Sequence, residues 1–171
     1  DPVYTLARNF YRSGSIRDLV EMHAQYRRKT SWRAASNRHD WKLDPAVSMG
    51  LIGEFGTHQF DVMHWYTGKY PTHVRARGAV LAYPDGREVA DTVSAELTFP
   101  GGITMTYQAT LANSYEGQYE LLVGTMGAIK LGWTHGWLFK EADAPTQGWE
   151  VYANRQTFHN DEGITLIANA T

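Results

Sequence analysis

Three polar side chains at helical spacing are the residues of this sequence with the clearest potential for chemistry. Glu54, His58 and Asp61 occupy positions i, i+4 and i+7, so a helix would place them on one stripe. An unperturbed histidine side chain has a pKa of about 6.5, so it can take or give a proton near neutral pH. A carboxylate one turn away can hold the ring and favour its charged form. The spacing therefore fits a proton-transfer site centred on His58.

The same spacing leaves two other interpretations open. In the first, His58 forms hydrogen bonds within the core while Asp61 caps or pairs locally. In the second, Glu54, His58, Asp61 and His64 ligate a metal ion, since all four are possible ligands. His64 lies off the stripe and no second ligand cluster is evident in the sequence, so we expect no metal.

A helix over residues 49–66 would position these side chains. Gly68 follows the last periodic residue and predicts the end of the helix. Gly53 and Gly56 are poor helix formers, costing roughly 1 kcal/mol each relative to alanine. They make sense if another backbone, a substrate or a cofactor must come close. The apolar residues that recur on one face of this helix are Leu51, Ile52, Phe55, Val62, Met63 and Tyr66.

Two runs of alternating apolar and polar residues, 92–99 and 103–111, flank Pro100-Gly101-Gly102 and predict a β-hairpin. The apolar face of the hairpin needs a covering layer, and the helix at 49–66 is the candidate. The opposite face is rich in threonine and uncharged except for Glu96. It is either a solvated face or a sheet-on-sheet contact between subunits. We favour the subunit contact, and thus a homo-oligomer, because β-branched hydroxyl side chains pack well against one another.

The remaining elements complete an α+β pattern. Asp1 and Pro2 are a helix start, with Ser13-Gly14-Ser15 as the end of that helix. Residues 30–48 lack a clear period and indicate a long surface loop over a cleft. We predict one domain over 1–171, with an open, mostly antiparallel sheet and helices packed on one face. The other predicted strands are 19–27, 74–83, 119–124, 128–131 and 137–141.

Composition narrows the classes of function. The 171 residues fit one domain, and a net charge of -2 with scattered basic residues argues against a nucleic-acid partner. The absence of cysteine excludes disulfides and cysteine-based zinc sites. No apolar run approaches the roughly 20 residues of a membrane span, so we expect no membrane association. The chain begins at Asp1, so we interpret it as a fragment; we favour the cytoplasm as its location, with export left open.

Several short motifs occur in an order and spacing that resemble a known family. They are segments 1–4, 14–20, 41–44, 50–61, 85–89, 99–102 and 124–127, together with Trp65 and Gly68. The sequence is similar to the C-terminal domain of the Gfo/Idh/MocA oxidoreductases, which include glucose–fructose oxidoreductase and inositol dehydrogenase. The similarity covers nearly the whole chain, and it rests on the combination of motifs rather than on any one of them.

The resemblance implies an N-terminal Rossmann domain, absent from this chain, followed by an α+β domain whose open sheet mediates dimers or tetramers. It implies oxidation or reduction of a sugar, cyclitol or related polyol with NAD or NADP. The family's acid-x-x-x-His pair falls on Glu54 and His58, and the acid that follows it falls on Asp61. The usual first acid of the family is aspartate, so Glu54 departs from the pattern by one methylene group.

Two further motifs of the family are absent from this chain. It has neither a Gly-x-Gly-x-x-Gly loop nor the Glu-Lys-Pro motif whose lysine completes the family's site. We therefore expect that NAD or NADP serves the full-length parent and that no cofactor binds this fragment. The expected substrate-binding residues are Asp61 on the helix and Arg38, Trp41 and Lys42 on the irregular loop.

Besides a metal-dependent hydrolase, which the metal interpretation of the helix would imply, two alternatives to a sugar oxidoreductase remain open. The parent could be an NAD-dependent glycoside hydrolase of the same fold, which would cleave its substrate through a transient oxidation. The domain could also act only as a non-catalytic oligomerisation or carbohydrate-binding module.

Overall fold

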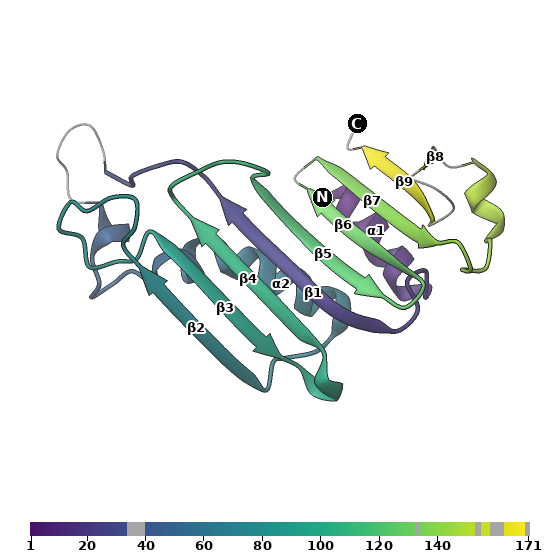
Figure 1. The fold of residues 1–171 in the computed structure, drawn as a ribbon, viewed down its shortest axis with the longest axis horizontal. Helices are drawn as coiled ribbons and strands as arrows, with labels where there is room; N and C mark the ends of the chain where they lie inside the picture. The colour runs from purple at the N-terminus through teal and green to yellow at the C-terminus, as the bar shows by residue number, and fades with distance from the viewer. Residues whose placement is uncertain (34–39, 133, 153–154, 158–162, 170–171) are drawn as a thin grey trace. The chain divides into compact units, whose positions relative to one another are not determined.

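The computed structural model of the chain describes residues 1–33, 40–132, 134–152, 155–157 and 163–169 (Figure 1). The chain divides into two compact units. Asp1–His23 and Tyr119–Thr171 form the first unit, and Ala24–Gln118 form the second. Strand β1 (Leu19–Arg27), predicted from the sequence, has residues in both. Among the described residues, no helix is long and apolar enough to cross a membrane.

The first unit opens with helix α1 (Pro2–Arg12), which confirms the predicted start at Asp1 and Pro2. The carboxylate of Asp1 caps this helix by accepting a hydrogen bond from the N–H of Val3 at 2.8 Å. Helix α1 contacts strands β6 and β7, and its buried residues are Val3 and Ala7. Burial of this apolar stripe is what fixes an 11-residue helix that would be marginal by itself.

Antiparallel strands make up the sheet of the first unit. Leu122, Ile129 and Leu138 face each other across three of these strands and are buried. Among the described residues, five strands of this unit lie side by side. The first three of them were predicted from the sequence, and the last two were not. Their order is β5 (Gln118–Gly124), β6 (Gly127–Gly132), β7 (His135–Glu141), β9 (Gly163–Asn169) and β8 (Arg155–Thr157), and the short helix η4 (Gly148–Tyr152) lies between β7 and β8 in the chain.

The second unit contains the predicted hairpin. Strands β3 (Thr92–Thr98) and β4 (Thr104–Thr110) pair in antiparallel register, with Ala95 opposite Tyr107, around the turn η3 (Pro100–Gly102). Strand β2 (His73–Ala79) pairs with the other edge of β3. Apart from the half-buried Ile103, the apolar residues of the hairpin are buried: Val93, Ala95, Leu97, Phe99, Met105, Tyr107, Ala109 and Leu111.

Strand β2 is shorter than predicted, since the prediction extended it to Tyr83. Residues 81–83 are not in a strand because their N–H groups bind the Asp91 carboxylate instead of a neighbouring strand. A buried carboxylate that accepts three backbone hydrogen bonds is a stable alternative to the ladder.

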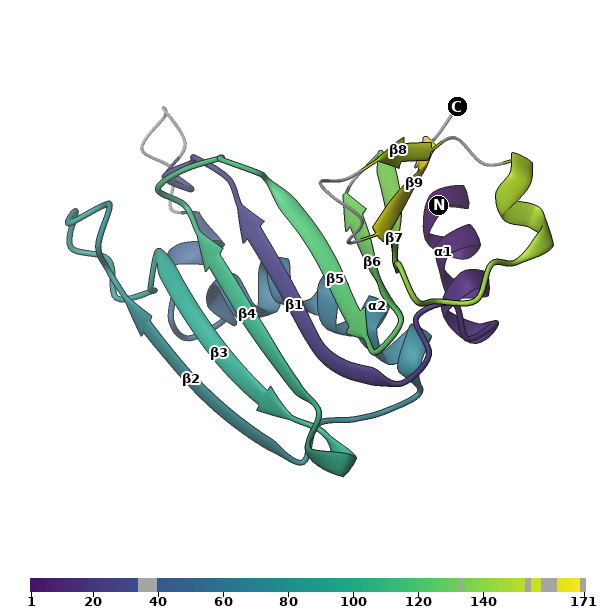
Figure 2. The same ribbon diagram turned by 45° about the vertical axis from the view of Figure 1, so that its right-hand side comes forward.

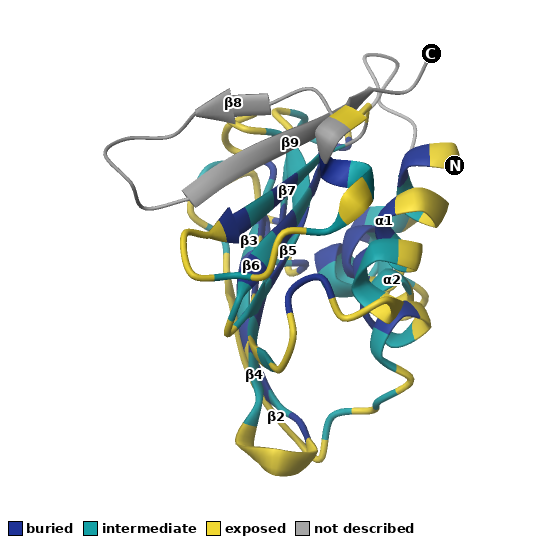
Figure 3. Ribbon diagram, turned by 90° about the vertical axis from the view of Figure 1, so that its right-hand side faces the viewer, coloured by how far each residue is buried: buried dark blue, intermediate teal, exposed yellow. Residues whose placement is uncertain are grey.

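The predicted helix over 49–66 is present but not uniform. Its first part, η2 (Ile52–Gly56), is a π-helix, and α2 (Thr57–Thr67) continues it as a regular α-helix. Gly68 ends the helix in the left-handed conformation, φ 66°, as predicted. Helix α2 lies behind strands β4 and β1, on one side of the strands (Figures 2 and 3), while the residues of β2 are all exposed. The fold class is therefore confirmed: α+β, with an open, mostly antiparallel sheet and helices packed on one face.

Candidate active site

The helix of the second unit brings the three predicted site residues to its outer surface. Glu54 lies half-buried in the π-helical part, while His58 and Asp61 are exposed on α2. Among the described residues, no hydrogen bond or ion pair joins these three to one another. The interpretation of His58 as a hydrogen-bonding core residue is wrong, because its imidazole lies in solvent. The buried polar residue of this helix is Gln59, whose side-chain amide donates to Gln25 O at 2.7 Å.

Gly56, the last residue of the π-helical segment, packs closely against other side chains. A Cβ added there would lie 2.8 Å from Phe60 Cε2 and 3.2 Å from Tyr107 Cζ, so only glycine lets the helix approach the sheet this closely. The rings of Phe60 and Tyr107 are 4.9 Å apart, which confirms the predicted contact between helix and hairpin. The hydroxyl of Thr57 donates to Gly53 O and satisfies a carbonyl of the wider turn. Side chains of this chain, rather than a ligand, therefore account for the close approach at Gly56. π-Helical turns are frequent at functional sites, and this one separates Glu54 from His58.

Aromatic side chains support the inner side of the π-helical segment. Phe55 stacks on Tyr26 with ring centroids 4.0 Å apart, and the buried Trp32 meets Phe55 edge-on at 5.7 Å. Glu54 therefore projects from a turn whose next residue is held in the core.

The predicted substrate-binding loop is described only in part. Arg38 lies outside the described residues. Trp41 and Lys42 belong to the short helix η1 (Trp41–Leu43), which Asp40 caps by accepting the N–H of Lys42 at 3.0 Å. Trp41 is 52% exposed, and Lys42 Nζ lies 3.4 Å from Asp40 Oδ1 and 5.5 Å from the centre of the Trp41 ring. The two side chains thus form an exposed aromatic and cationic pair, of a kind that suits polar ligands with apolar faces.

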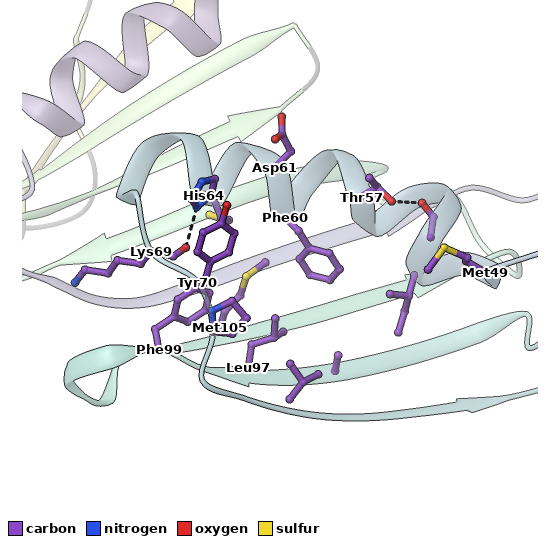
Figure 4. Close-up of a pocket in the computed structure, with 16 residues that line it drawn as sticks. Met49, Thr57, Phe60, Asp61, His64, Lys69, Tyr70, Leu97, Phe99 and Met105 are labelled. Atoms are coloured by element: carbon purple, nitrogen blue, oxygen red, sulfur yellow. Dashed lines mark hydrogen bonds between the residues drawn. The ribbon is translucent and has the colours of Figure 1, made fainter.

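An apolar groove of about 560 Å³ runs between the helix and strands β2–β4 (Figure 4). Asp61 contributes to its rim, but its carboxylate points away from the strands. At one end, His64 Nδ1 lies 3.1 Å from Lys69 O, and its ring stacks on Tyr70. Sequence periodicity could not reveal this groove, because it depends on how far helix and sheet separate. Its apolar lining includes Met49, Ile52, Phe60, Met63, Val74, Ala95, Leu97, Phe99 and Met105.

Two loops are held by charged side chains close to the start of the helix. Burial opposes ionisation of Asp91, but its hydrogen bonds from Leu81, Tyr83 and Ala82 outweigh burial and keep its pKa below the ordinary value. Hydrogen bonds from Arg87 and then Arg33 likewise hold the pKa of Asp85 well below its usual range. No group of three or more potential metal-ligating side chains occurs in the part of the chain that the structure describes.

Comparison with known proteins gives one family. A family model described as the GFO/IDH/MocA C-terminal domain matches residues 4–130. The 2,7-anhydro-N-acetylneuraminate hydratase of Escherichia coli (strain K12) is 26% identical over 127 residues, which are 73% of this chain and 33% of the hydratase. The chain therefore spans about a third of the length of this curated relative.

Solved structures share the fold. Levoglucosan dehydrogenase in complex with NADH and levoglucosan superimposes with a TM-score of 0.74 at 17% identity, over 98% of this chain and 44% of the dehydrogenase. An oxidoreductase domain protein from Kribbella flavida has a TM-score of 0.69 at 21% identity, over 81% of this chain and 40% of that protein. At these identities the matches speak for the fold alone.

Proposed function

Because this chain belongs to the GFO/IDH/MocA family, we propose that it is the substrate-side domain of an NAD(P)-dependent oxidoreductase that acts on a sugar, cyclitol or related polyol. The observation that carries this proposal is the position of His58. Its imidazole lies in solvent on the helix that carries the acid-x-x-x-His pattern, with a half-buried acid one turn before it and an exposed acid after it. A proton-transfer group must be reachable by substrate, and His58 is.

In this proposal His58 takes the proton of a substrate hydroxyl, and the hydride on the same carbon would pass to the nicotinamide cofactor of the parent. In the reverse direction His58 returns the proton. Glu54 and Asp61 orient the imidazole or bind neighbouring hydroxyls. Trp41 offers a flat apolar surface to one face of the ring of the substrate, and Lys42 a cation to its hydroxyls. Side chains oriented by the fold lower the activation barrier of the reaction, because their conformational entropy is lost on folding and not during the reaction.

Gly53 and Gly56 of the helix do not form a phosphate-binding loop. The helix that carries the site begins in a π-helical turn whose Gly53 and Gly56 face Met49, Phe60 and Tyr107, not an open cradle of N–H groups. The redox step therefore belongs to the cofactor and to a Rossmann domain of the parent, and this chain supplies orientation and proton handling.

The deciding experiment is His58→Ala in the full-length parent, with His73→Ala as its control. His73 is an exposed histidine on β2, in the same unit but not on the helix. We expect kcat/KM with a polyol substrate to fall by about 10²–10⁴-fold for His58→Ala and to stay unchanged for the control. A His58→Ala enzyme within a few-fold of wild type would remove this histidine from the mechanism.

A second candidate function follows from the curated relative in Escherichia coli, which is named a hydratase. Addition of water to a sugar changes no net oxidation state, so a parent of this kind would consume no NAD while converting its substrate. A nicotinamide held through repeated turnovers, as in a glycoside hydrolase that works by transient oxidation, would behave in the same way. Product analysis together with absorbance of reduced nicotinamide separates these functions from a dehydrogenase.

The polar face of the hairpin is the proposed contact between subunits of a homo-oligomer. Thr92 Oγ1 and Thr110 Oγ1 lie 3.0 Å apart across the strands, and Arg77 Nε donates to Ser94 Oγ at 3.1 Å. These pairs bind hydroxyl groups and the guanidinium of Arg77 within the face, which suits packing against a second copy of the same sheet.

A further inference from the structure

Arg87 is a buried arginine that lies outside the proposed proton-transfer residues. Its side chain is 0% exposed, while that of its partner Asp85 is 30% exposed. Arg87 Nε donates to Asp85 Oδ1 at 2.8 Å, and Arg87 Nη2 donates to Asp85 Oδ2 at 2.7 Å. Two parallel hydrogen bonds between a guanidinium and a carboxylate fix the direction of both groups.

The same pair also binds the segment on both sides of Trp32. Arg87 Nη2 donates to Ser31 O at 2.9 Å. Arg33 donates through Nε to the Asp85 carboxylate and through Nη2 to Asp85 O at 3.3 Å. We call the contacts among Ser31, Arg33, Asp85 and Arg87 the Asp85–Arg87 clamp. It joins segments separated by more than 50 positions in the chain, as the separations of 52 and 56 show.

The clamp encloses a strained residue. Trp32 has φ 59°, in the left-handed region that bulky side chains rarely adopt. Its neighbours Ser31 and Arg33 both belong to the clamp. The Trp32 ring is buried, and its centroid lies 5.7 Å from that of Phe55. The surrounding contacts therefore hold a conformation that Trp32 would leave if it were released.

The loop that carries the clamp touches the helix at a second point. Val89 is buried, and a Cβ added at Gly50 would lie 3.5 Å from Val89 Cγ1. Gly50 itself has φ 62° at the start of the helix. The π-helical segment η2 is thus flanked by Trp32 on Phe55 and by Val89 at Gly50.

The clamp is poorly built for stability alone. Arg87 Nη1 is buried and has no hydrogen-bond partner among the described residues, and an unsatisfied buried donor lowers stability. The ion pair joins a buried guanidinium to a partly exposed carboxylate, so it is also weak evidence for stability, because desolvation of Arg87 offsets the attraction. A role in fixing local geometry explains why Arg87 is buried with an unsatisfied donor, whereas a role in stability alone does not.

We propose that Asp85 and Arg87 are positioning residues, which act through Trp32 and Phe55 to fix the π-helical segment Ile52–Gly56 and the direction of the Glu54 side chain. The part of this inference that concerns Glu54 in catalysis rests on the proposed function. The positioning itself can be measured without any activity.

The first test is hydrogen exchange on the 171-residue chain. Arg87→Lys keeps the positive charge but loses the two parallel hydrogen bonds to Asp85, and Arg87→Met removes both the charge and the hydrogen bonds. We expect amide exchange at Trp32 and over Ile52–Gly56 to become at least tenfold faster in both variants, while amides of β3 and β4 change less than twofold. Arg75→Met, an exposed arginine on β2, is the control and should change neither region. Equal acceleration everywhere, or none at Ile52–Gly56, overturns the proposal; if Arg87→Met does not fold, Arg87→Lys decides.

The second test uses the full-length parent. For Arg87→Lys and Asp85→Asn we expect kcat to fall at least tenfold with KM within threefold, and Asp85→Glu to recover part of the loss. If His58→Ala abolishes activity but Arg87→Lys and Asp85→Asn leave kcat unchanged, the positioning role is wrong and the proposed function stands. If His58→Ala has no effect, the proposed function is wrong, and the exchange experiment still decides whether the clamp fixes the π-helical segment.

Discussion

The carboxylate of Asp91 accepts a hydrogen bond from the backbone N–H of Tyr83 at 2.8 Å, across a separation of 8 residues. The same carboxylate also accepts the N–H groups of Leu81 and Ala82, and Asp91 is fully buried. One side chain therefore satisfies the backbone of a loop that would otherwise leave three donors unpaired at the end of β2.

Asp91→Asn should destabilise the chain by about 1–3 kcal/mol at pH 7, because a neutral amide binds the three N–H groups less well. The pKa of Asp91 is lowered in the folded chain, so its contribution is complete above the ordinary carboxyl pKa and is lost as pH falls through the folded value. The difference between variant and wild type should therefore shrink on acidification below about pH 4. Urea unfolding at pH 7 and at lower pH measures it.

The control for this prediction is Asp143→Asn, which changes an exposed acid in a loop. It should leave unfolding at pH 7 within experimental error. A stability difference for Asp91→Asn that stays constant down to pH 2 would mean that ionised Asp91 does not provide the stabilisation.

Lys140 and Glu150 form a buried ion pair, with side chains 7% and 7% exposed. Lys140 Nζ also donates to Pro145 O at 2.6 Å, and Glu150 accepts the N–H of Gln147 at 2.9 Å. Lys140→Met should cost about 3–5 kcal/mol, because it removes the cation that donates a hydrogen bond to the buried Glu150 carboxylate. The double variant Lys140→Met/Glu150→Leu should cost clearly less, and equal losses in the two variants would contradict this account. Chemical denaturation of the three proteins gives the comparison.

Gly56→Ala tests the close contact between helix and sheet. The added methyl group would meet Phe60 and Tyr107, and overpacking of this kind typically costs about 1–3 kcal/mol. Alanine also favours a helix by roughly 1 kcal/mol, so the expected net effect is a moderate loss of thermal stability. Gly148→Ala, where nothing lies within 4 Å, is the matched control. A Gly56→Ala chain as stable as wild type would show that the helix can move away from Tyr107 freely.

Thr106→Glu places a charge on the polar face of the hairpin, where Thr106 is exposed on β4. If that face joins two subunits, the charge would be desolvated and the oligomer should dissociate at micromolar concentration. Light scattering after size-exclusion chromatography measures the mass. Asp143→Asn again serves as the control. A wild-type chain that elutes as a monomer at all concentrations would contradict the proposed contact.

The parts of the fold that depend on local sequence could be predicted. The hairpin follows from alternation on either side of Pro100-Gly101-Gly102, and the ends of the helices follow from Asp1 and Gly68. The helix that carries Glu54, His58 and Asp61 follows from helical spacing in the same way, but its π-helical segment Ile52–Gly56 interrupts the regular spacing between Glu54 and His58. The roles of these three residues stay predictions, and so do those of Arg38, Trp41 and Lys42.

The parts that depend on contacts between distant segments could not be predicted. The π-helical segment ends where Gly56 packs close to Tyr107, and β2 stops early because Asp91 binds the N–H groups that would have continued it. The Asp85–Arg87 clamp joins residues 31–33 to residues 85–87, and the polar residues in these two loops give no sequence signal for the contact. The partners in the clamp and at Tyr107 lie about 50 residues away, and Asp91 lies 8 to 10 residues from the N–H groups that it binds, so periodicity and capping rules do not reach any of these contacts.

Strand β2 ends the order of its sheet, and every one of its residues is exposed. Arg75 and Arg77 point to the same side of it, opposite Glu96 and Ser94 of β3. Two such edges meeting in antiparallel fashion would bring their guanidinium groups together, so repulsion discourages strand-to-strand stacking of chains into fibrils. Replacing both arginines by valine would remove this repulsion and make the edge of β2 prone to aggregation. Such a variant would be difficult to produce in quantity.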